Sequence, residues 1–137
     1  MKGGIEQFRK LVKQIPNLVQ VAEQIIDLNQ KMRFVGIIDL KGNIVEGIMK
    51  KGKTSLESQK ENEHFCRQVA QRRRMRREFD KSLGKVRYVH VERGKVTQLA
   101  VYTKHYTFFV TVEPELSIVK KLEVINKIKK IISGNSF

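Results

Sequence analysis

The spacing of hydrophobic residues changes at Arg33, and this change constrains the fold more than any other feature of the sequence. Before Arg33, apolar residues recur every seven positions, which is typical of an amphipathic helix; one such series is Leu11, Leu18, Ile25 and Met32. From Arg33 to Asp39 the residues form an apolar run of strand length. The turn residues Lys41-Gly42-Asn43 then lead into a second such run, Ile44 to Met49. The pattern predicts a helical segment followed by a β-hairpin.

The helical segment, Ile5 to Met32, carries an apolar stripe three wheel positions wide. That width favours packing on a sheet or a neighbouring helix over a two-stranded coiled coil. Pro16 removes one backbone hydrogen bond, so we expect a kink, or two helices that meet near Ile15–Asn17.

A second helix is expected after the hairpin. Thr54 or Ser55 can cap its first turn, and Thr54 with Glu57 has the spacing of a capping box. The helix is predicted to run to Leu83, where Gly84 provides a stop.

Three strand-like runs follow, at Val86 to Val91, Val96 to Thr103 and Tyr106 to Val112. Pro114 then fits the first turn of a last helix. Its predicted buried residues are Leu116, Val119, Leu122, Ile125, Ile128 and Ile132. Its predicted solvent face carries five lysines, namely Lys120, Lys121, Lys127, Lys129 and Lys130.

These elements predict an α+β fold with a five-stranded, mainly antiparallel sheet in the order ββαβββ. We expect one domain over residues 1–137, made of an N-terminal helical extension (5–32) and a core (33–132). A length of 137 residues is typical of one domain.

The composition narrows the function class. The chain has 28 Lys and Arg against 14 Asp and Glu, a net charge of +14, yet 40% of its residues are hydrophobic, too many for a disordered basic tail. A single Cys excludes an internal disulfide framework, and no apolar run has the length of about 20 residues that a membrane span needs. We therefore expect a cytoplasmic protein.

The order of elements, with the segment GIIDLKGNIVEG at Gly36 to Gly47, resembles the roadblock and dynein-light-chain group of profilin-like folds. More closely, the chain resembles a family of uncharacterised archaeal proteins of this type. Three segments carry this closer match, namely Arg33 to Asn43, Met75 to Tyr88, and Phe108 to Glu115.

The resemblance implies a non-enzymatic module that dimerises through its middle helix and the adjacent edge strand, here Leu56 to Leu83 and Val86 to Val91. Such modules act as platforms or regulators for partners such as small GTPases. The dimer interface is then expected to contain Phe65, Val69, Arg72, Met75, Arg76, Phe79, Tyr88 and His90. The segment 5–32 is longer than the helix of a minimal roadblock domain, and it is expected to pack either on its own chain or on a second subunit.

Six arginines lie within eleven residues of the middle helix, at positions 67, 72, 73, 74, 76 and 77. Three of these arginines can form ordinary i,i+4 pairs on a solvated helix face, namely Glu63–Arg67, Arg74–Glu78 and Arg76–Asp80. On a helical wheel, however, Arg72 and Arg76 fall on the apolar face, where they must extend along it to solvent or meet an anion. The hypothesis is an anion or nucleic-acid site formed by Arg72, Arg73, Arg76 and Arg77.

No motif for an enzyme, a cofactor or a metal site is present. His64, His90 and His105 are far apart in sequence, and Cys66 is most simply a small buried residue. Three functions are left open: a homodimeric regulatory module of the roadblock type, a binder of nucleic acid or another polyanion, and a PAS-like sensor. The sensor would require a sizeable enclosed pocket for its ligand.

Overall fold

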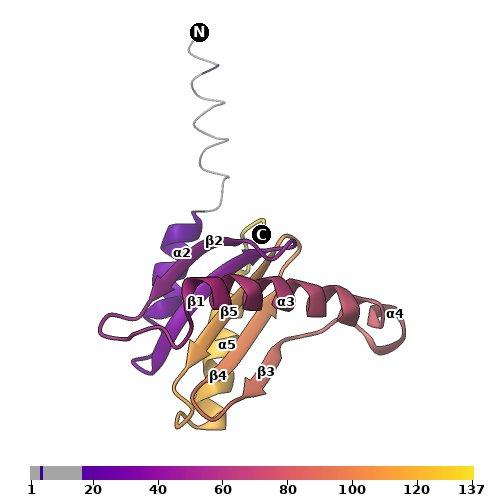
Figure 1. Cartoon of the computed structure of the whole chain (residues 1–137). Coiled ribbons are helices and arrows are strands. Elements are labelled where there is room, and N and C mark those ends of the chain that lie inside the picture. The colour runs from indigo at the N-terminus through magenta and orange to yellow at the C-terminus, as the bar shows by residue number, and fades with distance from the viewer. Residues whose placement is uncertain (1–3, 5–16) are drawn as a thin grey trace.

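The computed structural model describes Gly4 and residues 17–137, and its centre is a five-stranded sheet in the order β2-β1-β5-β4-β3 (Figure 1). Every neighbouring pair of strands is antiparallel, as predicted. The strands are β1 (Met32–Asp39), β2 (Ile44–Met49), β3 (Val89–Glu92), β4 (Thr97–Tyr102) and β5 (Tyr106–Val112). The helices are α2 (Leu18–Ile26), α3 (Gln59–Arg77), α4 (Asp80–Leu83) and α5 (Ile118–Ile132).

The β1–β2 hairpin forms as predicted, with a turn that its own residues stabilise. The Asp39 carboxylate accepts hydrogen bonds from the backbone N–H groups of Lys41 and Asn43, each at 2.9 Å. Gly42 has φ of +94°, and a Cβ atom there would lie 2.5 Å from the Cα atom of Arg67 in α3. Glycine is therefore required twice at this position, for its backbone conformation and for the close approach of the helix.

Helices α2 and α5 cover one face of the sheet and share a single hydrophobic core with it. The buried residues of α2 are Val21, Ala22, Ile25 and Ile26, and they pack with those of α5 and of the strands. Asn17 caps α2 by accepting a hydrogen bond from the Gln20 N–H at 3.1 Å. Residues 18–26 thus pack on their own chain, on the face opposite α3.

The first helical segment was expected to reach Met32, and this bound is wrong. Helix α2 ends at Ile26, and Met32 is the first residue of β1, fully buried. The Asn29 side chain accepts a hydrogen bond from the Lys31 N–H at 2.8 Å, which favours a turn over continued helix. The expected kink residues Ile15 and Pro16, like the rest of 5–16, lie outside the described residues.

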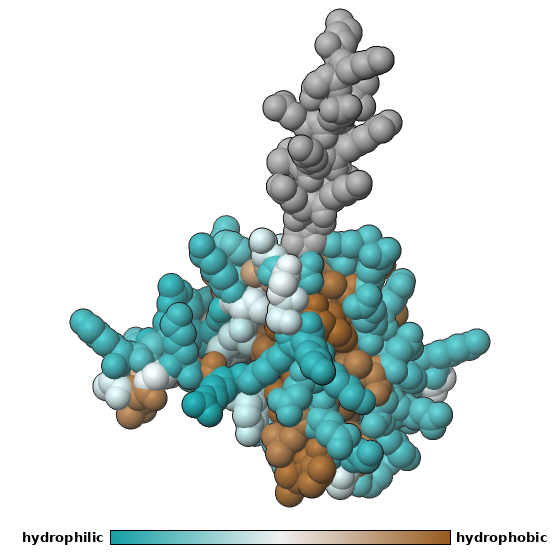
Figure 2. Space-filling view, turned by 180° about the vertical axis from the view of Figure 1, so that it is seen from behind, coloured by the Kyte–Doolittle hydropathy of each residue, from teal (hydrophilic) through white to brown (hydrophobic). Residues whose placement is uncertain are grey.

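Helix α5 begins later than predicted: its N-cap is Ser117, whereas Pro114 was expected in its first turn. The Ser117 hydroxyl accepts a hydrogen bond from the Lys120 N–H at 3.2 Å. Ile125, Ile128 and Ile132 are buried as predicted, whereas Val119 is 66% exposed. Ile118 beside it is 65% exposed. Figure 2 shows the molecule from behind, where hydrophobic surface lies among hydrophilic side chains. Lys121, predicted to face solvent, is buried.

Helix α3 lies on the other face and differs from the prediction at both ends. Ser58, not Thr54 or Ser55, is its cap, and the Ser58 hydroxyl accepts a hydrogen bond from the Glu61 N–H at 3.2 Å. The helix is interrupted after Arg77, and the four-residue α4 then ends at Gly84 with φ of +85°. No residue of α4 is buried, so packing does not hold a continuous helix here.

The edge strand β3 is shorter than the predicted Val86 to Val91. It pairs with β4 only from Val89 opposite Ala100 to Glu92 opposite Thr97. Residues 84–88, which precede β3, run from α4 back to the sheet (Figure 1). Near the end of β4, the side chain of Tyr102 contacts Arg73 and Arg76 of α3. Among the described residues, no helix combines the length and apolar character needed to cross a membrane.

Candidate functional site

Helix α3 is fixed on the sheet by its first half. Cys66, Val69 and Ala70 are its buried residues. The Phe65 ring lies 5.5 Å from that of Phe109 in β5, measured between centroids. Phe65 and Val69, both predicted for the dimer interface, therefore pack against their own sheet, while Cys66 is buried as predicted.

Arg73 ties the second half of α3 to the β4–β5 turn. Its guanidinium donates hydrogen bonds to the Tyr106 carbonyl at 2.7 Å, to the Thr107 hydroxyl at 3.2 Å and to the Thr103 carbonyl. It also lies over the Tyr102 ring, 4.6 Å from the centroid. Burial, together with the neighbouring charge of Arg77, lowers the pKa of Arg73. The wheel placed Arg73 off the apolar face, yet it makes the most contacts to the sheet of the four arginines in the hypothesis.

Arg72 and Arg76 lie on the side of α3 that faces β3. Arg76 donates a hydrogen bond to the Tyr102 hydroxyl at 2.9 Å. Arg72 is exposed, and with Arg76 it lines a small hollow of about 40 Å³ whose other walls include Val89 and Val91. Both side chains thus extend over apolar surface, which was one of the two arrangements expected for them.

The other apolar residues predicted for this helix face, Met75, Phe79 and Leu83, are exposed to solvent. Met75 is 58% exposed, Phe79 is 56% exposed and Leu83 is 81% exposed. They lie where α3 and α4 project beyond the sheet (Figure 1).

Tyr88 and His90, both predicted for the dimer interface, lie on the side of the sheet that α5 covers. The His90 Nε2 atom is 2.6 Å from the Glu92 carboxylate, which in turn accepts a hydrogen bond from Lys121 of α5 at 2.8 Å. Tyr88 lies under the ammonium of Lys129, 5.5 Å from its ring centroid. Because side chains alternate along a strand, Val89 and Val91 are the residues of this edge that face α3.

A basic cavity of about 490 Å³ lies beside the second half of α3. Of the four arginines in the anion-site hypothesis, Arg73, Arg76 and Arg77 line it and Arg72 does not. Lys85 and Lys104, which were not predicted for the site, also line it. The remaining lining residues are Asp80, Val86, Tyr102 and Thr103.

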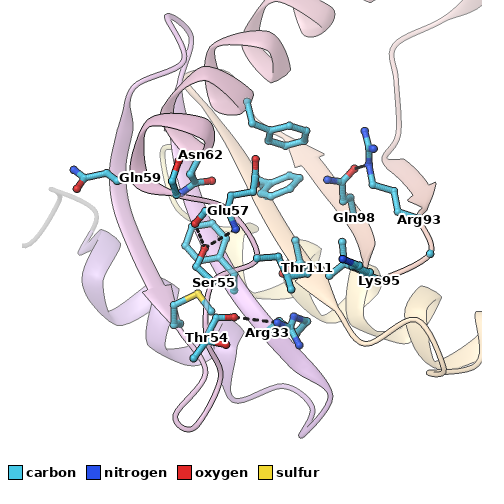
Figure 3. A pocket seen from close by; sticks show the side chains of 18 residues that line it. Arg33, Thr54, Ser55, Glu57, Gln59, Asn62, Arg93, Lys95, Gln98 and Thr111 are labelled. Carbon is cyan, nitrogen blue, oxygen red and sulfur yellow. Dashed lines mark hydrogen bonds between the residues drawn. The ribbon is translucent and has the colours of Figure 1, made fainter.

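A larger groove of about 660 Å³ lies at the other end of α3, between the sheet, residues 54–59 and the β3–β4 turn (Figure 3). Its apolar lining is Phe34, Met49, Leu56, Phe65, Val96 and Phe109. Burial and the nearby charge of Glu61 raise the pKa of Glu57 on its wall. The groove is open to solvent, unlike the enclosed pocket that a PAS-like sensor requires.

The model of a family of unknown function (DUF6659) matches residues 16–134. The chain belongs to this family. No curated protein sequence matches this DUF6659 member significantly.

Solved structures confirm the α+β, roadblock/profilin-like fold of this DUF6659 member. The roadblock/LC7 domain from Streptomyces avermitilis has a TM-score of 0.65 at 11% identity, over 85% of this chain and 95% of that one. The gliding protein MglB from Thermus thermophilus has a TM-score of 0.67 at 11% identity, over 87% and 90%. Profilin II from Acanthamoeba castellanii has a TM-score of 0.57 at 13% identity, over 87% and 98%. At these identities the similarity shows the fold alone.

Cys66 is buried, and the possible metal ligands of the described residues do not cluster. Burial, followed by the charge of Glu57, raises the pKa of the Cys66 thiol to about 11, which keeps it protonated and weakly nucleophilic at neutral pH. Within residues 17–137, no three His, Cys, Asp or Glu side chains come together as a metal site.

Proposed function

We propose that this chain is a non-enzymatic regulatory module that works as a homodimer in the cytoplasm. The observation that carries the proposal is the uncovered apolar surface of Met75, Phe79 and Leu83 beside the open edge of β3. An unpaired strand edge next to exposed apolar side chains is a surface that a second chain can cover.

The edge strand and the helix supply complementary parts of this surface. Val91 of β3 is exposed and faces the α3 side of the sheet, as does Arg72 across the small hollow. In a two-fold dimer, the same surface of both copies meets itself, so β3 would pair with β3 and the helices would cover each other's apolar residues. Phe65 and Val69 would then hold α3 on its own sheet and would not contact the partner chain.

Similar folds support a role in assembly. A solved structure described as MglB with a tetrameric arrangement has a TM-score of 0.64 at 13% identity, over 82% of this chain. The class of partner that we propose, a small GTPase, rests on the resemblance to roadblock modules.

The test of the dimer is sedimentation velocity of the wild-type chain and of Phe79→Glu at several concentrations. A buried charge in a two-fold interface appears twice, so we expect the dissociation constant to rise by more than about thirtyfold, equivalent to about 2 kcal/mol. Val19→Glu is the matched control, because Val19 is a similarly exposed apolar residue on α2, on the other side of the sheet. A wild-type chain that stays monomeric, or equal weakening by Val19→Glu, would contradict the proposed interface.

A further inference from the structure

We propose that the basic cavity beside the second half of α3 binds a small oligophosphate, with Arg76, Arg77, Lys85 and Lys104 as its anion-binding groups. The proposal concerns a surface distinct from the apolar residues of the proposed dimer interface and does not depend on that dimer.

The cavity brings together cations from three separate parts of the chain. Arg76 and Arg77 come from α3, Lys85 follows α4, and Lys104 lies in the β4–β5 turn. With Arg73 they make five positive charges around about 490 Å³, against the single carboxylate of Asp80. The volume falls within the range of small-molecule sites, and the net charge of the lining, five minus one, is +4.

These four cations, like several other exposed basic residues in the described part of the chain, have no carboxylate partner. Arg33 and Lys53 each lie 2.8 Å from Glu113, and Lys121 lies 2.8 Å from Glu92. In residues 17–137, by contrast, Arg76, Arg77, Lys85 and Lys104 form no ion pair, and the hydrogen-bond acceptor of Arg76 is the neutral Tyr102 hydroxyl. The positive charges of these side chains repel one another, and a bound anion would offset this repulsion by attracting each of them.

The floor of the cavity is held in place before any ligand binds. Arg73 uses its donors on the backbone carbonyls of Thr103 and Tyr106, and its guanidinium lies over the Tyr102 ring. These contacts fix the backbone of α3 against the β4–β5 turn, so the segments that carry Arg77 and Lys104 are held together before a ligand binds. A preorganised backbone lowers the entropy cost of bringing the two side chains to one ligand.

The shape and charge favour an oligophosphate over a single phosphate or a nucleic-acid strand. Arginine forks and lysine ammonium groups are the usual protein ligands of phosphate oxygens, and a net charge of +4 suits a ligand with more than one phosphate. A nucleic-acid strand needs a basic track with aromatic rings available for stacking. Here the Tyr102 ring is already covered by Arg73.

The test is isothermal titration of the full chain with tripolyphosphate, comparing the wild type with the double variant Arg77→Gln/Lys104→Gln. We expect one site per chain in the wild type and at least about tenfold weaker binding in the variant, because two charge-assisted contacts to the ligand are lost. The matched control, Arg72→Gln/Lys127→Gln, removes the same charge from exposed residues that do not line the cavity. It should bind tripolyphosphate within about twofold of the wild type.

Three results would overturn the proposal. One is an equal loss in the control variant, which would make binding a general effect of net charge. The second is no saturable binding of tripolyphosphate, and the third is binding of a short DNA duplex that the cavity variant weakens while tripolyphosphate does not bind. Inorganic phosphate is titrated in parallel and should bind more weakly than tripolyphosphate. Circular dichroism checks that both variants, whose changed side chains are exposed, remain folded.

Discussion

Lys121 joins helix α5 to the edge strand β3 through an ion pair between its buried ammonium and the half-exposed carboxylate of Glu92. Its side chain is 3% exposed, and its ammonium donates hydrogen bonds to the Glu92 carboxylate at 2.8 Å and to the Pro114 carbonyl at 2.9 Å. Glu92 also accepts a hydrogen bond from the Thr97 hydroxyl at 2.8 Å and contacts His90. The hydrogen bonds from Lys121, then from His90 and Thr97, lower the pKa of Glu92 to about 2. A buried ammonium requires such a partner, because unpaired it would carry a large desolvation cost.

We predict that Glu92→Gln lowers the free energy of unfolding by about 1–3 kcal/mol, because it leaves the buried ammonium without a charged acceptor. Urea denaturation followed by circular dichroism measures this change. Glu115→Gln is the control, since its ion pair with Lys31 spans 3.4 Å between largely exposed side chains and should contribute about 0–1 kcal/mol.

The same pair makes stability depend on pH in a definite direction. The pKa of Glu92 is lower in the folded chain than its ordinary value of 4.5, so its contribution is complete above 4.5 and is lost as the pH falls through about 2. The stability of the wild type should therefore fall more steeply below pH 4.5 than that of Glu92→Gln. Glu113 supplies part of the remaining slope, because Lys53 and Arg33 lower its pKa as well. Parallel slopes for the two proteins would show that Glu92 is not coupled to folding in this way.

At the scale of elements, the β1–β2 hairpin was predictable because its signals are local. The turn residues and the two apolar runs lie within eighteen positions, and β2 has the predicted bounds. The start of α3 was not predictable, because Thr54 with Glu57 and Ser58 with Glu61 have the same capping-box spacing. A tertiary contact accompanies the observed choice, in which Arg33 donates a hydrogen bond to the Thr54 carbonyl at 3.1 Å.

The candidate site could be predicted only where one helix carries it. Arg76 and Arg77 were found from their clustering on the middle helix, whereas Lys85 and Lys104 reach the cavity from segments whose position depends on the whole fold. Tyr88 and His90 were predicted for the same interface as residues of α3, but the register of β3 places Val89 and Val91 on the α3 side. A shift of one residue along a strand exchanges its two faces, and the sequence does not specify the register of so short an edge strand.

The contact between the β1–β2 turn and α3 leads to a prediction about Gly42. Gly42→Ala should lower the free energy of unfolding by more than about 2 kcal/mol, because the new Cβ would lie 2.5 Å from the Arg67 Cα atom and 3.0 Å from the Cys66 carbonyl oxygen. Backbone atoms of a packed helix cannot move aside as the end of a flexible side chain can. Chemical denaturation gives the size of the effect.

Gly52→Ala separates the two causes of this cost. Gly52 has a similar positive φ, +84°, but a Cβ atom there meets nothing within 4 Å. It should therefore show only the conformational cost of about 1–2 kcal/mol. If the two variants lose equal stability, the close approach of the turn to α3 contributes nothing.

At the scale of the whole molecule, the two faces of the sheet are covered unequally. Helices α2 and α5 cover one face and share a large core with it, whereas α3 covers the other through a smaller core. The second half of α3 and the residues that follow it to the end of α4 carry both the uncovered apolar residues and the arginines that line the basic cavity. The two proposed binding surfaces thus belong to one part of the molecule, and they can be separated by substitutions at Phe79 and at Arg77 with Lys104.

The excess of positive charge makes a last prediction for the whole chain. With 28 Lys and Arg against 14 Asp and Glu, repulsion outweighs attraction between exposed charges, and it opposes the compact state. Raising NaCl from about 10 mM to about 300 mM screens these exposed charges, so the melting temperature should rise. Arg77→Gln/Lys104→Gln should melt higher than the wild type at low salt and show a smaller rise, because it removes two of the converging cations. Thermal melts followed by circular dichroism measure both effects. A melting temperature that falls with salt would mean that ion pairs such as Arg33–Glu113 contribute more to stability than the repulsion costs.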